Sequence, residues 1–123
     1  MAWDLDSDRP IFLQIVERIR LDIVSGRYAP GDKLPSVRDL AGEAAVNPNT
    51  MQKAFSELER TGLVHSFRTS GRYITEDTAL IESVKQTLAE RHIEDFLSRM
   101  DRLGYQDEEI LSLIRQTMKG GTK

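Results

Sequence analysis

The sequence lacks cysteine altogether, and among its 123 residues it has only two histidines, His65 and His92. Without cysteine there is neither a disulfide framework nor a thiolate metal site, and two histidines do not make a histidine-rich one. A reducing compartment is consistent with this composition. His92 lies among Leu88, Ile93 and Phe96 in the sequence. A role in metal binding or pH sensing is possible there, but we expect a partly buried, hydrogen-bonded histidine.

Long apolar runs are missing as well. No stretch approaches membrane-spanning length, and the N-terminus has neither a basic start nor an apolar run, so we expect a soluble, cytoplasmic protein without a membrane partner. The sequence also lacks a Ser/His/Asp set, a nucleophilic cysteine, a phosphate-binding loop and a ligand cluster. In a chain that is 30% charged, scattered carboxylates normally lie on the surface. We therefore predict no enzyme, no catalytic residue, no metal and no cofactor.

Positive charge is in deficit overall, since the formal net charge is −3. Residues 9–75 nevertheless hold ten Lys/Arg against seven Asp/Glu, a balance of +3, whereas residues 76–123 hold seven against ten, a balance of −3. Three aspartates in the first eight residues account for the remainder. A polyanionic partner would meet this basic middle. Taken alone, an imbalance of this size is equally well explained by ordinary scatter.

The basic middle begins with an amphipathic helix. From Pro10, apolar residues recur at steps of three and four, and Gly26 provides a stop. Two prolines and a Pro-Gly turn make residues 27–35 a loop. The residues before this helix alternate, with Trp3 and Leu5 apolar, which indicates a short extended segment that packs on the body.

A second and a third helix follow, separated by a tight turn. Ser36 caps the second helix, and both this helix start and Arg38 are natural phosphate contacts. Asn47-Pro48 is a strong start signal for the third helix. Its buried stripe consists of Met51, Ala54, Phe55 and Leu58.

The other face of the third helix is polar without an obvious structural purpose. Asn49 and Gln52 carry paired donors and acceptors suited to adenine edges, Thr50 suits a thymine methyl group, and Lys53 reaches guanine or phosphate. A merely solvated helix face is the alternative. Residues 63–67 and 72–74 then alternate as two strands of a hairpin, so that the cap, the turn, the spacing and the hairpin together favour a helix-turn-helix that binds duplex DNA.

The last third of the chain is helical. The periodicity predicts one helix of about 25 residues that ends at Gly104, and a second that begins at the acidic residues 107–109. We expect a frayed tail from Gly120. The apolar stripe of these helices either packs on residues 10–75 or forms a dimer face, and size favours the dimer. The predicted dimerisation residues are Ile81, Val84, Leu88, Phe96, Met100, Ile110 and Ile114.

The order of these elements resembles the winged-helix domain of GntR-family transcriptional regulators. The resemblance covers about residues 9–75, and a match of this density is far more specific than a lone short motif. The Asn-Pro-Asn-Thr turn and the short helical tail resemble the YtrA-like branch. The matching residues are Gly26, Tyr28, Pro30-Gly31-Asp32, Leu34-Pro35-Ser36-Val37-Arg38, Leu40-Ala41, Val46-Asn47-Pro48-Asn49-Thr50, Ala54-Phe55, Leu58-Glu59 and Gly62-Leu63.

The resemblance implies a fold, a set of contacts and a partner. The wing departs from the branch's basic Arg-Gly-Lys-Gly turn, because this chain has Arg68-Thr69-Ser70-Gly71, which makes a weaker probe of the minor groove unless Arg72 compensates. The branch dimerises through its two C-terminal helices and has no large effector-binding domain. Together the residues and the resemblance predict DNA contacts at Ser36, Arg38, Asn47, Asn49, Thr50, Gln52, Lys53, Arg68, Thr69, Ser70, Gly71 and Arg72.

The predicted fold is therefore mainly α with a small β-hairpin wing, a winged helix-turn-helix followed by two C-terminal helices. Residues 1–76 form the DNA-binding domain, with an N-terminal extension over 1–8, and residues 77–123 form a helical dimerisation tail. The predicted function is that of a sequence-specific, dimeric regulator that binds a palindromic operator and represses its own or a neighbouring operon. A winged helix used as a protein-interaction module is the alternative. The sequence identifies no effector.

Overall fold

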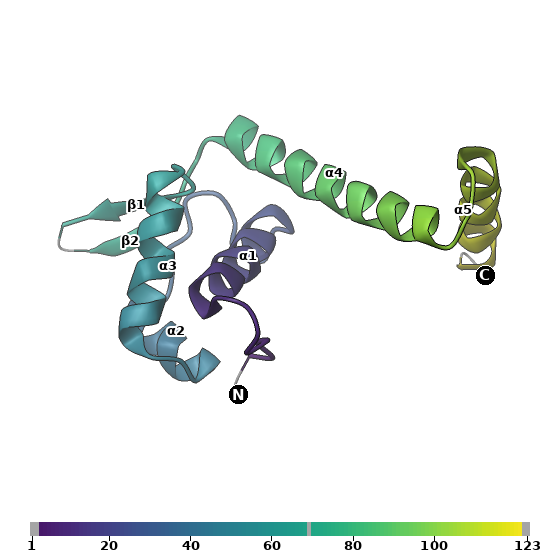
Figure 1. The fold of residues 1–123 in the computed structure, drawn as a ribbon. Coiled ribbons are helices and arrows are strands. Elements are labelled where there is room, and N and C mark those ends of the chain that lie inside the picture. The colour runs from purple at the N-terminus through teal and green to yellow at the C-terminus, as the bar shows by residue number, and fades with distance from the viewer. Residues whose placement is uncertain (1–2, 69, 122–123) are drawn as a thin grey trace. The chain divides into compact units, whose positions relative to one another are not determined.

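The computed structural model describes residues 3–68 and 70–121. Its elements, drawn in Figure 1, are α1 (Ile11–Val24), α2 (Val37–Ala44), α3 (Pro48–Arg60), β1 (Val64–Phe67), β2 (Gly71–Ile74), α4 (Thr78–Arg102) and α5 (Asp107–Gly121). The predicted fold class is confirmed. Among the described helices, none combines the length and the apolar character that crossing a bilayer requires.

The contacts divide the chain into two compact units, the first extending to Lys85 and the second beginning at Gln86. This division lies beyond the boundary predicted after residue 76. The first eight residues of α4, Thr78 to Lys85, therefore belong with the first unit, where Ile81 and Val84 pack against its core.

The core of the first unit lies where α1 and α2 pack against α3. The predicted stripe of α3 is confirmed, since Met51, Ala54, Phe55 and Leu58 are all buried. They meet Ile15 and Ile19 of α1 and Leu40 of α2, and the hairpin closes the core from the other side. The members of this core are Ile15, Val16, Ile19, Ile23, Leu34, Leu40, Ala41, Ala44, Met51, Ala54, Phe55, Leu58, Leu63, Val64 and Ile74.

Both predicted helix caps are confirmed. The Ser36 hydroxyl accepts a hydrogen bond from the backbone N–H of Asp39 at 3.0 Å, and the Asn47 side chain accepts one from Asn49 at 2.7 Å. Each bond satisfies an amide that the first helical turn leaves without a partner. Between the caps, Ala45 adopts a left-handed conformation (φ 59°), which turns the chain from α2 into α3. The helix-turn-helix geometry is therefore fixed by local interactions at both helix starts.

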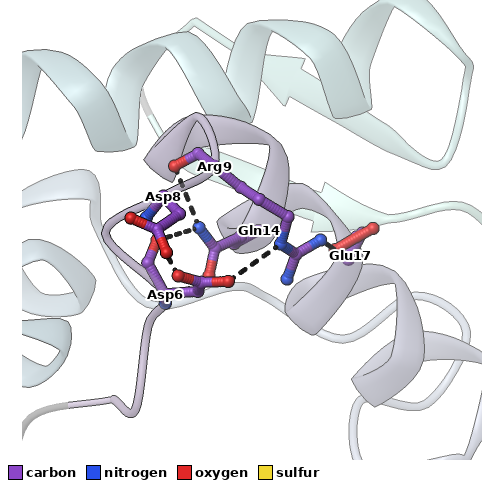
Figure 2. A network of polar contacts seen from close by, with 5 residues as sticks. All are labelled: Asp6, Asp8, Arg9, Gln14 and Glu17. Atoms are coloured by element: carbon purple, nitrogen blue, oxygen red, sulfur yellow. Dashed lines mark hydrogen bonds and ion pairs between the residues drawn. The ribbon is translucent and has the colours of Figure 1, made fainter.

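A buried glutamine holds the N-terminal segment against α1 (Figure 2). The Gln14 side chain is 6% exposed, accepts from the Asp6 backbone N–H at 2.7 Å, and donates to the carbonyls of Asp6 at 2.6 Å and Arg9 at 3.1 Å. Arg9 in turn pairs with Asp6 and with Glu17, each at 3.5 Å. Because these bonds fix the backbone of the segment, the residues that precede it are directed onto the domain.

Trp3 and Leu5 pack against the core, as predicted. The indole Nε1 of Trp3 donates to Glu43 of α2 at 2.9 Å, and the guanidinium carbon of Arg18 lies 4.6 Å from the centroid of the indole ring. The segment therefore joins α1 to α2 and supports the helix-turn-helix from its N-terminal side.

The hairpin pairs Val64 with Ile74 and Phe67 with Gly71 in an antiparallel register. One feature of the loop before α2 was not predicted: Lys33 forms an antiparallel bridge with Tyr73 on the outer edge of β2. The sequence indicated an irregular loop here because the prolines exclude a helix. Prolines do not prevent a single β-bridge at a residue between them.

The helix α4 has 25 residues, as predicted, of which those from Gln86 onward belong to the second unit, and Gly104 follows it with φ +91°. Two expectations for this part of the chain are wrong. The helix α5 continues through Gly120 to Gly121, so the predicted fraying does not begin at Gly120; residues 122 and 123 lie outside the described residues. His92 is exposed rather than partly buried, because it lies on a face of α4 that no other described element covers.

Candidate nucleic-acid interface

The outer face of α3 presents a stripe of polar side chains at helical spacing. Asn49, Gln52, Lys53 and Ser56 are all exposed, on the side opposite the buried stripe. The Gln52 amide lies 3.5 Å from the Ser56 hydroxyl, a separation at the limit of hydrogen bonding. The amides of Asn49 and Gln52 therefore offer both donors and acceptors at the surface, which is the chemistry that base edges require.

Thr50 lies on the flank of α3 and is half-buried. It contributes to a hollow of about 380 Å³, whose lining also includes Trp3, Leu5, Val46 and Asn47. Of the three residues predicted to read bases, Thr50 is therefore the least exposed, and its methyl and hydroxyl groups lie beside the N-terminal segment.

Lys53 is held toward α1. Its ammonium lies 4.0 Å from the centroid of the Phe12 ring, a distance at which a cation is attracted to the face of an aromatic ring. The side chain is still exposed. This contact directs Lys53 toward one edge of α3, away from its centre, which favours a phosphate over a guanine among the two predicted partners.

At the N-terminus of α2 the cap and the cation are adjacent. Ser36 is engaged with the Asp39 amide, and Arg38 is exposed on the first turn. Among the described residues, no ion pair within 4.0 Å involves Arg38. The helix start and the guanidinium can therefore act on the same anion, because the N-terminal amides and the positive end of the helix dipole lie beside the cation.

The wing carries exposed polar groups at its turn. Arg68 and Ser70 are exposed, and the backbone N–H of Ser70 donates to the carbonyl of Phe67 at 3.2 Å. Gly71 adopts φ +101°, a conformation that residues with a side chain rarely take. The predicted contact at Thr69 lies outside the described residues.

Arg72 has a different environment from the other predicted contacts. Its Nε donates to Glu59 of α3 at 2.6 Å, and its guanidinium carbon lies 5.1 Å from the centroid of the Phe55 ring. Glu59 also accepts from the Ser66 hydroxyl at 2.7 Å. Partial burial tends to raise the pKa of Glu59, but the hydrogen bonds from Arg72 and Ser66 outweigh it and hold the pKa below its ordinary value. This cluster joins both strands of the wing to α3.

Two polar side chains beside these residues were not among the predicted contacts. Ser56 continues the exposed stripe of α3, and the helical period alone was a sufficient signal for it. Lys33 is exposed beside the wing. No local signal reveals that position, because it depends on the pairing of two segments distant in the sequence.

These features define a class of protein. Two capped helices joined by a tight turn, a second helix with an exposed polar face, and a hairpin bound to that helix make up the winged helix-turn-helix of DNA-binding transcription regulators. Residues 12–74 match the model of the bacterial regulatory proteins of the gntR family, and the chain belongs to this family. Proteins of this family, including the relatives described below, are transcriptional regulators and not enzymes.

The similarity to two proteins of Bacillus subtilis extends over nearly the whole chain. An uncharacterised transcriptional regulator, YhcF, is 41% identical over 98% of this chain and 100% of its own length. The transcriptional repressor YtrA is 37% identical over 98% of this chain and 95% of its own. The short tail is therefore shared with these relatives.

Two solved structures are similar to this chain. A GntR-family regulator from Listeria monocytogenes has a TM-score of 0.85 and 42% identity, covering 91% of this chain and 98% of its own. The DNA-binding domain of AraR, solved in complex with its operator ORE1, has a TM-score of 0.53 and 27% identity, covering 61% of this chain and 94% of its own. The second structure shows a related domain bound to an operator.

Proposed function

We propose that the protein is a dimeric repressor that binds a palindromic operator of its own or a neighbouring operon. The observation that carries this proposal is the exposed stripe on α3, whose amides at Asn49 and Gln52 are held at the surface by a capped, fully packed helix. The operator complex of the AraR domain supports DNA as the partner. The name of the relative YtrA supports repression.

The contacts divide into those that position the protein and those that read sequence. In the proposal, Ser36 and Arg38 hold phosphate at the start of α2, and Lys53 holds phosphate at one edge of α3. Asn49 and Gln52 read bases in the major groove, with Thr50 on their flank. Asn47 orients α3 by capping it. Asn47 also adds a contact with the DNA at the N-terminus of α3.

The wing has a mixed role in this proposal. Arg68, with Thr69 and Ser70, approaches the minor groove or its phosphates, and Gly71 supplies the backbone conformation that the turn needs. Arg72 acts mainly by joining the wing to α3, because its guanidinium is already bonded to Glu59.

The second unit supports a dimer because it leaves much of its apolar surface uncovered. Among its described residues Ile110 is 3% exposed, whereas Ile93 is 56% exposed and Leu103 is 71% exposed. A pair of helices of this size cannot bury a sufficient core alone, and fewer than about 40 residues usually need an additional stabilising partner. Large exposed apolar surfaces of this kind mark interfaces. A second copy of the chain provides the matching surface.

The proposed dimer face centres on an apolar hollow of about 310 Å³ between α4 and α5. It is lined by Phe96, Met100, Leu113, Ile114, Thr117 and Met118. Leu88 and Ile110 belong to the same unit. Ile81 and Val84, which were predicted for the dimer face, pack on the core of the first unit, so we assign them to the junction between α4 and the winged helix.

Two-fold symmetry would then present two copies of α3 to two half-sites. Such half-sites are separated by one helical turn of DNA or more, and the operator is palindromic because the dimer is symmetric. Residues 1–76 would read the operator, residues 77–123 would set the spacing, and the start of α4 would join the two functions.

Selection of bound fragments from the whole genome by the purified protein tests this function. The expected result is a palindromic sequence upstream of the protein's own operon or a neighbouring one. Fragments without a common sequence would contradict the proposal. A stoichiometric protein partner recovered at high salt, with no DNA bound, would favour the interaction-module alternative.

A further inference from the structure

The segment before α2 is held against β2 as if it were a third strand of the wing. The backbone N–H of Leu34 donates to the carbonyl of Arg72 at 2.8 Å, and that of Ile74 donates to Asp32 at 2.8 Å. Gly31 donates to the Ile74 carbonyl at 3.0 Å. Three bonds over this short segment fix the backbone of Lys33 relative to the wing.

The side chain of Lys33 extends along the wing toward its turn. A Cβ atom placed on Gly71 would lie 3.2 Å from Cε of Lys33 and 3.9 Å from its Nζ. Gly71 thus leaves the space in which the Lys33 stem lies, in addition to supplying the left-handed backbone (φ +101°). The ammonium is therefore placed beside the turn that contains Arg68, Ser70 and Gly71.

The cation of Lys33 is available for a partner outside the chain. Its side chain is exposed, and none of the ion pairs within 4.0 Å in the described part of the chain involves it. Arg72, the basic residue of β2, has a side chain that is 24% exposed and bonded to Glu59. The turn Arg68-Thr69-Ser70-Gly71 contains no lysine. Of the two cations beside the turn's end, Lys33 is thus the one without a carboxylate.

We propose that Lys33 supplies a second cation beside the wing turn, in addition to Arg68, and that it binds a backbone phosphate of the operator beside the wing. This inference rests on the proposed function, because it assigns a further contact within the same DNA interface. A lysine ammonium acts as a point charge and needs no fixed geometry, so it suits a phosphate better than a base edge. The contact is therefore independent of sequence.

The dependence of binding on salt tests this assignment. Each neutralised phosphate adds about 0.9 to the slope of log K against log salt concentration. The dimer carries two copies of Lys33, one at each half-site. Fluorescence anisotropy of Lys33→Gln with a selected palindromic operator should therefore give a slope shallower than that of the wild type by about 1.8. The ratio of the wild-type affinity to the Lys33→Gln affinity should then shrink by about 12-fold between 50 and 200 mM salt. Lys33→Arg should retain the wild-type slope.

The matched control is Lys85→Gln, which removes an exposed lysine from α4 and should leave the slope unchanged. Thermal unfolding of each free variant verifies folding. An unchanged slope in Lys33→Gln, or equal losses in Lys33→Gln and Lys33→Arg, would overturn the assignment. A change in base preference would overturn the phosphate as the ligand. If the wild type itself shows no salt-sensitive binding, the proposed function fails, and this inference fails with it.

Discussion

The side-chain oxygens of Ser36 and Asn47 are already engaged within the protein, because each accepts a backbone N–H from the helix it begins. Their first effect on DNA binding is therefore indirect. They hold the ends of α2 and α3 in place, and the free amides and the dipole of each helix end then act on the nucleic acid. Substitutions at such a residue can therefore separate its effect on folding stability from its effect on DNA binding.

Ser36 offers that separation. Ser36→Ala should lower the free energy of unfolding by about 1 kcal/mol, because it leaves the Asp39 amide without its cap. Ser36→Asp should retain the stability, since aspartate caps as well as serine, yet it should weaken DNA binding by placing a negative charge beside the proposed phosphate. Urea unfolding and anisotropy measure the two effects. Equal DNA affinities for the wild type and Ser36→Asp would contradict the phosphate site.

Arg38 and Gln52 should differ in how they affect specificity. Arg38→Ala should weaken binding to all sequences alike and reduce the salt slope by about 1 per half-site, or about 2 for the dimer, because it removes one phosphate contact from each copy. Gln52→Ala should instead change the preference at one base position by about 1–3 kcal/mol. Competition binding against a library of single-base operator variants distinguishes the two. The control is Arg115→Ala in α5, which should have neither effect.

At the scale of elements, the wing is joined to α3 by Glu59. Glu59→Gln should destabilise the protein by about 1 kcal/mol at neutral pH, because it replaces a partly exposed ion pair and weakens two hydrogen bonds. The matched control is Glu57→Gln, which removes a carboxylate paired with the exposed Arg60 on the same helix and should cost less. If the wing has loosened, backbone amides of β1 and β2 should exchange hydrogen faster in Glu59→Gln than in the wild type, and the exchange in Glu57→Gln should be unchanged.

The same cluster predicts a dependence on pH. The folded-state pKa of Glu59 lies below the ordinary value of 4.5, so its carboxylate contributes stability above that value. This contribution is lost as the pH falls through the folded-state pKa. The difference in unfolding free energy between the wild type and Glu59→Gln should therefore be full at pH 7 and shrink below about pH 4.5. A difference that stays constant with pH would contradict the ion pair.

Local chemistry explains which elements were predictable from the sequence. Ser36 and Asn47-Pro48 are start signals that act within a few residues, and the stripe from Met51 to Leu58 repeats with the helical period. Both were therefore predicted correctly. The environments of Arg72 and Lys33 were not predicted, because they arise where β2 meets α3 and where the loop meets β2. Such pairings join residues far apart in the chain and have no local signature.

The stripe along α4 illustrates the same limit. Ile81 and Val84 share one helical period with Phe96 and Met100, so the sequence assigned all four to one dimer face. In the structure the first two pack on the winged-helix core. A periodic pattern identifies the apolar face of a helix, whereas the surface that covers each part of that face depends on tertiary structure.

For the molecule as a whole, the proposed function requires a dimer. Phe96→Asp should shift the protein from dimer toward monomer, because it places a charge in the apolar hollow of the second unit. Ser98→Asp, at an exposed position of the same helix, is the control and should leave the dimer intact. Sedimentation velocity over a range of concentrations measures the change. A monomeric wild type would contradict the proposed dimer. If Phe96→Asp remains dimeric, the apolar hollow is not the dimer interface.

Loss of the dimer should affect palindromes selectively. Linking two half-site contacts typically raises affinity by about 10²–10⁴, so Phe96→Asp should lose most of its affinity for the palindrome and retain its affinity for one half-site. Equal losses on both DNAs would indicate damage to the winged helix itself.

The central claim is that paired recognition helices read a palindrome through base contacts and hold it through phosphates. Anisotropy titrations of the wild type on the selected operator, on an operator with one half-site scrambled and on unrelated DNA, repeated from 50 to 200 mM salt, test it most directly. The account predicts that all three affinities fall with salt and that the intact palindrome binds at least about 10³-fold more tightly than unrelated DNA. Equal affinity for the three DNAs at every salt concentration would contradict it.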